Sequence, residues 1–255
     1  MNPTIVGVIV FICTFAGALF GMWLRGILPE HHLNAESRDT VKVGVGLIAT
    51  MTALVLGLVT ASAKSSFDAV DRAMKQTASE ILALDRVLAR YGSETVEIRK
   101  GLQRAVGARI DMIWSPGSSM QAKLDPIRSG TAAEDEGVVD VIRRLSPRDD
   151  AQRALRSRAL DLSESLLQAR WPVLAGSATS VPMTFLVILM LWLTITFASF
   201  GLFSPWNATV LTVLCVCALS VGSAMFLILE MDAPFDGLLK VSADPWRYAH
   251  SRLNQ

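Results

Sequence analysis

Charged side chains are missing from four long stretches of this 255-residue sequence. Residues 5–24, 43–63, 183–203 and 208–229 contain no Asp, Glu, Lys or Arg. A helix needs roughly 20 mainly apolar residues to cross about 30 Å of hydrocarbon. All four stretches are long enough, and the positive mean hydropathy of +0.41 agrees with them. The missing charge therefore excludes an ordinary soluble protein and predicts an all-α membrane protein with four transmembrane helices.

The same absence of charge bears on function. Proton-coupled pumps and many transporters keep ionisable residues at membrane depth, where charge is costly and usually functional. The polar groups that these four stretches offer are Ser and Thr hydroxyls, so they hold no carriers for a proton relay. A passive pore or a non-conducting membrane protein fits them better than a pump.

Cysteine and enzyme motifs are scarce as well. The three cysteines, Cys13, Cys215 and Cys217, all lie in apolar stretches, which favours small buried side chains over a disulfide or a metal site. The sequence shows no catalytic triad, phosphate-binding loop or metal motif. We therefore expect no enzyme, no cofactor and no metal centre. The first stretch lacks a basic flank and a small-residue cleavage site, which favours a retained span over a signal peptide.

These stretches predict four ranges along the chain: residues 1–63 with the first two spans, 64–182 as a cytosolic helical region, 183–229 with the other two spans, and 230–255 as a cytosolic tail. The middle region has 18 basic and 16 acidic residues, a balance that gives no basic patch for nucleic acid. It also shows no strand pattern. We expect a helical bundle inserted between the second and third spans.

Apolar periodicity runs from the second span into the middle region. Its members alternate three and four apart: Phe67, Val70, Met74, Thr77, Ile81, Leu84, Leu88 and Tyr91. Because no Pro or Gly interrupts them, the spacing predicts one continuous helix from about residue 43 to residue 90, ended by Gly92. Further on, Ser146-Pro147-Arg148-Asp149 predicts a helix start with Ser146 as the N-cap.

Basic residues near the span ends indicate the orientation. One side of the membrane receives Lys64, Arg72, Lys75, Arg158, Arg170, Lys240 and Arg247, and the other receives Arg25, Arg38 and Lys42. The excess favours cytoplasmic N and C termini. Arg25, which follows a first span with no charge before it, taken alone favours the opposite orientation.

The second span carries two distinct faces. One consists of small residues four apart, Ala49, Ala53, Gly57 and Ala61, which let another helix approach closely. They predict packing around an oligomeric axis or, as the alternative, against other spans of the same subunit. The other face consists of Ile48, Met51, Val55, Leu58 and Ser62. From the residues alone, contact with lipid is the favoured interpretation of this face. The alternative is an apolar constriction that gates by dewetting, which makes these five residues our pore-lining candidates.

Three carboxylates follow the last span. Glu230, Asp232 and Asp236 could offer hard oxygen ligands to an ion such as calcium. The simpler interpretation, which we favour, is a helix stop at the membrane interface, with Pro234 and Gly237 turning the chain.

Three segments together resemble a known family: residues 27–33 (ILPEHHL), 46–68 and 230–237. In order and spacing they are similar to the bestrophin-like bacterial membrane proteins, known as a domain of unknown function, over essentially the whole chain. The resemblance implies kinship with bestrophins, which are pentameric chloride channels. Their second span lines the pore, and cytosolic helices lie between their second and third spans.

The resemblance implies a homo-oligomeric, pentameric ion channel that passes inorganic ions such as chloride across the lipid bilayer of a bacterial inner membrane. Two departures limit what carries over. The long acidic run after Phe235 is absent, so calcium gating is not implied, and the second span lacks the aromatic residues of the bestrophin neck. The alternative is a non-conducting membrane scaffold or sensor whose cytosolic helices bind a partner. A ring-shaped particle would favour the pore, and a dimer would favour the scaffold.

Overall fold

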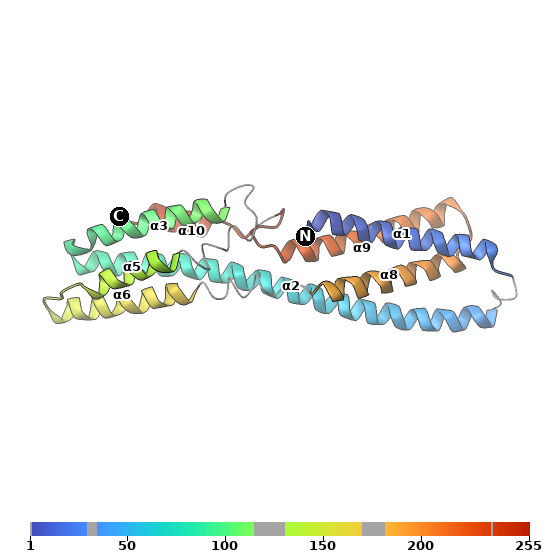
Figure 1. Cartoon of the computed structure of the whole chain (residues 1–255), viewed down its shortest axis with the longest axis horizontal. Helices are drawn as coiled ribbons and strands as arrows, with labels where there is room; N and C mark the ends of the chain where they lie inside the picture. Colours follow the sequence, from blue (N-terminus) through green and yellow to red (C-terminus); the bar gives the residue numbers. More distant parts are fainter. Residues whose placement is uncertain (1, 30–34, 115–130, 170–181, 236) are drawn as a thin grey trace. The chain divides into compact units, whose positions relative to one another are not determined.

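The computed structural model describes residues 2–29, 35–114, 131–169, 182–235 and 237–255, except for the side chains of 35–38 and 131–136. Every regular element among these residues is a helix (Figure 1). Four of the helices are long and apolar enough to cross a membrane, as the charge-free stretches predict. The chain forms two compact units, Met1–Ser65 with Ser180–Asp232, and Ser66–Thr179 with Ala233–Gln255.

The first unit contains the four apolar helices. They are α1 (Pro3–Ile27), the first part of α2 (Ala35–Tyr91), α8 (Met183–Phe203) and α9 (Ala208–Met231). Helix α1 packs against both α8 and α9 (Figure 1). Asn side chains cap two of these helices: Asn2 accepts the backbone N–H of Thr4 at 3.1 Å, and Asn207 accepts that of Val210 at 2.8 Å.

Glycines bring α1 and α8 into close backbone contact. A Cβ added at Gly21 would lie 1.9 Å from the carbonyl oxygen of Ala198, and one added at Gly201 would lie 2.0 Å from that of Ala18. Gly17, one turn before Gly21, would meet α8 in the same way at 2.9 Å. Only glycine fits such a crossing, because a side chain would occupy the space of the facing backbone.

Helix α2 is unbroken, as its apolar spacing predicts. It is helical for 57 residues and contributes Val70, Leu84 and Leu88, each about 1% exposed, to the core of the second unit. Gly92 ends it with a φ of 138°, which favours glycine. The Thr95 hydroxyl then donates to the carbonyl oxygen of Leu88 at 2.6 Å and satisfies a group at the helix end.

The second unit is a helical bundle. With the rest of α2 it contains a short 3₁₀ turn, η2 (Ser93–Thr95), followed by α3 (Val96–Trp114), α5 (Thr131–Arg143), α6 (Asp150–Gln168) and α10 (Asp244–Arg252). Within it α5 contacts α6, and α3 contacts α5 and α10. These helices enclose one apolar core.

The predicted start of helix α6 is wrong by a few residues. Helix α6 begins at Asp150, and Asp149 rather than Ser146 is its N-cap. The Asp149 carboxylate accepts the backbone N–H of Gln152 at 2.7 Å, and the Gln152 side chain accepts the backbone N–H of Arg148 at 2.8 Å. This reciprocal pair satisfies the free donors of the first turn better than Ser146 could, because Ser146 lies too far upstream to reach them.

A buried ion pair joins α2 to α3. Asp85 is fully buried, and Arg99 donates to both of its carboxylate oxygens, from Nε at 2.7 Å and from a terminal nitrogen at 2.9 Å. The hydrogen bond to Asp85 raises the pKa of Arg99 above its ordinary value, against the opposing effect of burial. The forked geometry holds the two helices at one register.

The C-terminal residues pack into the same core. Phe235 is 2% exposed and meets the Trp114 ring edge-on, with the ring centroids 6.3 Å apart. The indole N–H of Trp114 donates to the carbonyl of Val241 at 2.9 Å, and that of Trp246 donates to the buried carbonyl of Met74 at 3.0 Å. Aromatic burial therefore anchors residues after 233 to the bundle.

Candidate functional site

Helix α2 is the span that a single chain covers least. Over the most apolar window of each span, 11% of α2 is buried, against 39% of α1, 33% of α8 and 28% of α9. A helix that is apolar and yet so little covered must meet lipid, another subunit or a pore. This surface contains both of the faces that the sequence singled out.

The covered side of α2 is a narrow stripe. Thr52, Val59 and Ala63 are buried at 4%, 8% and 3% exposure, and Val45 continues the stripe half-buried. The Thr52 hydroxyl donates to the carbonyl of Ile48 at 2.7 Å, so its polar group is satisfied within the helix.

The structure separates the five pore-lining candidates into two groups. Met51 and Leu58 are 46% and 69% exposed, and Ser62 is also exposed. Ile48 and Val55 are half-buried and lie beside the covered stripe. The first group is therefore free to meet a pore or lipid, whereas the second supports it from behind. Their role in a pore stays a prediction.

The small-residue candidates lie on the other flank of the stripe. Ala49 is half-buried, and Ala53, Gly57 and Ala61 are exposed. A Cβ added at Gly57 would meet nothing within 4 Å. Within one chain, three of the four positions are thus uncovered, and their packing in an oligomer stays a prediction.

The exposed members of both sets belong to one continuous surface. Successive residues of a helix are turned by about 100°, which puts Leu47 and Leu54 between the exposed pore-lining candidates and the exposed small residues. Leu47 and Leu54 are themselves 64% and 76% exposed. One side of this surface is bulky and apolar, and the other side is small. A helix of this kind can contact a neighbour on one side and face an opening on the other.

The acidic segment after α9 forms a helix end. Helix α9 ends at Met231, ahead of Pro234, as the helix-stop interpretation predicts. Glu230 is 3% exposed, and Asp232 is the half-buried C-cap, whose N–H donates to the carbonyl of Ile228 at 3.2 Å. Asp236 lies outside the described residues. Among those described, no group of three or more His, Cys, Asp or Glu could hold a metal ion.

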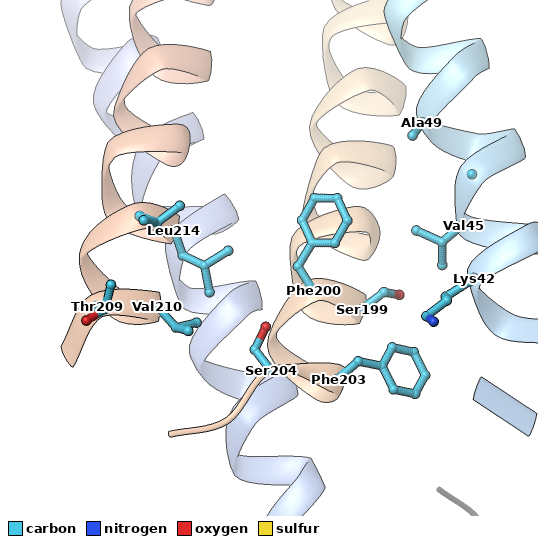
Figure 2. A pocket seen from close by; sticks show the side chains of 12 residues that line it. Lys42, Val45, Ala49, Ser199, Phe200, Phe203, Ser204, Thr209, Val210 and Leu214 are labelled. Atoms are coloured by element: carbon cyan, nitrogen blue, oxygen red, sulfur yellow. The ribbon is translucent and has the colours of Figure 1, made fainter. Parts of the chain in front are cut away.

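Sequence reasoning missed a pocket of about 580 Å³ in the first unit, where α2, α8 and α9 come together (Figure 2). Lys42 and Ala49 line it from α2, Phe200 from α8, and Leu214 from α9. Its walls come from distant parts of the chain, so no local spacing signals it. The glycine contact of α1 was missed too, although Gly17 and Gly21 form a GxxxG motif that could have indicated it.

Comparison with known protein families identifies the family of this chain. The model of the Bestrophin-like domain matches residues 12–246. The chain belongs to the Bestrophin-like family. This confirms the resemblance seen in the sequence, and the matched range begins within α1 and reaches Trp246 in α10, so it includes residues of both units.

Solved structures share the fold of this bestrophin-like protein. Two single-residue variants of a bacterial bestrophin homologue from Klebsiella pneumoniae are 13% and 15% identical to it, with TM-scores of 0.66 and 0.64. A membrane protein variant is 13% identical, with a TM-score of 0.65. Each match covers 96% of both chains. At such identities the likeness shows the fold alone. No curated protein matches the chain.

Proposed function

We propose that this bestrophin-like protein is a subunit of a homo-oligomeric ion channel and that α2 lines its pore. The observation that carries the proposal is the exposure of the membrane-spanning part of α2, since only 11% of its most apolar stretch is buried in a single chain. Subunits arranged around an axis would cover the small side of α2 with a neighbouring helix and leave the bulky side facing the opening. Kinship with bestrophins adds the expectation of five subunits and of anions, chloride among them, as the permeant ions.

The exposed bulky side supplies the constriction. Met51 and Leu58 are seven residues apart, which is about 10 Å along the helix, and both side chains are exposed. Repeated around an axis, they form two apolar rings, from which water withdraws readily, so that ions meet a desolvation barrier there. Ile48 and Val55 would hold these rings in place rather than line the opening, and Ser62 would present a hydroxyl beyond them.

The test is ion flux with purified protein in liposomes loaded with potassium chloride. We expect chloride efflux that exceeds that of empty liposomes and that rises in Leu58→Ala and Met51→Ala, because smaller side chains widen and wet the rings. Leu191→Ala is the matched control, since Leu191 is 55% exposed on α8 and lies outside the proposed pore. Flux that is absent in every form, together with a dimeric particle, would refute the channel and favour the scaffold.

A further inference from the structure

The pocket between α2, α8 and α9 has a polar end and an apolar end. Lys42, Ser204 and Thr209 line the end where α8 and α9 are joined, and Ser199 lies one turn deeper on α8. Figure 2 shows Ala49 and Leu214 further into the unit, away from the turn that carries Ser204. Lys42 and Ala49 are seven residues apart, so the lining changes character over about 10 Å of α2.

The hydroxyls of this pocket differ from most of the others in the spans. Most span hydroxyls donate to the carbonyl four residues earlier, as do Thr14, Thr50, Thr52, Thr60, Thr194, Thr196, Thr212, Ser220 and Ser223. By contrast, the side chains of Ser199, Ser204 and Thr209 make no hydrogen bond with any part of the chain that the structure describes. These three groups are therefore available to a ligand.

Lys42 adds a positive charge at the same end. Its ammonium group lies 3.3 Å from a carboxylate oxygen of Asp39, but the two side chains are 54% and 74% exposed. An exposed pair of this kind is weak, so the ammonium group can still attract a second anion. The Ser199 hydroxyl and the ammonium group, on the same side of α8 in Figure 2, together suit a phosphate, which accepts several hydrogen bonds.

The polar end lies at the level where lipid headgroups are found. Trp206, in the turn between α8 and α9, is 72% exposed, and tryptophan gathers at the membrane–water interface. The remaining lining is mainly apolar, with Val45, Phe200 and Val213 among its residues. The pocket volume of about 580 Å³ is within the usual range of ligand sites, roughly 300–1,000 Å³.

We propose that this pocket binds one anionic phospholipid. The phosphate lies against Lys42 and the hydroxyl of Ser199, which face the same side of α8 in Figure 2, and an acyl chain extends toward Ala49. A water-soluble ligand does not fit the apolar end. An apolar helix face of a second copy would leave the hydroxyl of Ser199 without an acceptor. The inference does not depend on whether the protein conducts ions.

The test is native mass spectrometry of the detergent-purified full chain with added dioleoyl phosphatidylglycerol or dioleoyl phosphatidylcholine. Two glycines of α2 give a matched pair, because a Cβ at Gly44 or at Gly46 meets nothing within 4 Å and only Gly46 lines the pocket. We expect Gly46→Leu to remove binding of both lipids and Gly44→Leu to leave it unchanged.

The charge is tested by a second pair. Lys42→Gln should weaken binding of the anionic lipid about fivefold, since one basic residue near a membrane surface contributes about 1 kcal/mol. It should weaken binding of the zwitterionic lipid less, because the choline group already offsets the charge of that phosphate. Arg25→Gln removes the same charge from an exposed position in the last turn of α1 and should change the binding of neither lipid.

Equal binding of both lipids to the wild type, or equal effects of the two variants within either pair, would overturn the proposal. A change in oligomer mass with Gly46→Leu would also overturn it, because a second copy would then cover the pocket.

Discussion

Replacing Gly21 by Ala should separate α1 from α8. The added Cβ would lie 1.9 Å from the carbonyl oxygen of Ala198, whereas ordinary contact begins at 3.4 Å, so the backbones must move apart by about 1.5 Å at this point. Over-packing of this kind costs about 1–3 kcal/mol, and a facing backbone cannot rotate away as a side chain can. The better helix propensity of Ala returns at most about 1 kcal/mol. We expect a net loss of about 2 kcal/mol in the free energy of unfolding.

The assay is reversible unfolding of the purified protein in mixed micelles with increasing dodecyl sulfate, followed by circular dichroism. Gly26→Ala is the control on the same helix, because its Cβ would meet nothing within 4 Å. The control should be neutral or slightly stabilising. If the two variants unfold at the same dodecyl sulfate fraction, glycine does not specify the α1–α8 contact and the reasoning is refuted.

Other predictions concern the second unit and the oligomer. Asp85→Ala leaves Arg99, whose side chain is only 14% exposed, without its partner and should cost about 3–5 kcal/mol in thermal or denaturant unfolding. Asp71→Ala removes a pair whose Lys75 is 59% exposed and should cost at most about 1 kcal/mol. Because the pKa of Arg99 is raised, its stabilising effect is lost only as the pH rises through that elevated value, so the Asp85→Ala difference should be the same at about pH 7 and about pH 10. Trp246→Phe leaves a buried carbonyl on α2 without its donor and should cost about 1–3 kcal/mol, read as faster proteolysis of the C-terminal segment. Gly57→Leu should lower the yield of detergent-stable oligomer while leaving the unfolding of the single chain unchanged, and an unchanged yield would show that this face contacts lipid.

The sequence predicted those features that depend on local periodicity. Four charge-free stretches became four apolar helices, and α2 continued without a break because no residue between 67 and 91 interrupts its apolar spacing. Buried positions followed as well: Val70, Leu84 and Leu88 are among the least exposed side chains of the second unit. Periodicity is sufficient here because a helix presents the same face every seven residues.

Contacts between distant segments were beyond this reasoning. Small residues four apart occur in both α1 and α2, and spacing alone cannot say which stripe meets another helix in the same chain. In the structure, Gly17 and Gly21 of α1 are in close contact with α8, whereas Gly57 of α2 remains uncovered. The pairing of Asp85 with Arg99 depends likewise on how α2 and α3 pack.

The pore-lining role of the second span stays a prediction, and the structure shows which of its candidate side chains a single chain leaves exposed. The second span is the least covered one, but the narrow buried stripe of α2 divides its pore-lining candidates. Met51 and Leu58 differ from Val55 in exposure because residues three and four apart differ in angle by up to about 60°. Such a difference depends on where the neighbouring helices lie, and one helix alone does not reveal it.

The most direct test of the channel is whether water reaches the predicted wall of the pore. In a background with Cys13, Cys215 and Cys217 replaced by Ala, Leu58→Cys is reconstituted into liposomes and treated with a charged, membrane-impermeant thiol reagent. Our account predicts that the reagent modifies this cysteine and changes chloride flux, whereas Leu191→Cys on α8 is protected by lipid and gives unchanged flux. Modification of neither cysteine, or flux that ignores the modification of Leu58→Cys, would contradict a pore lined by α2.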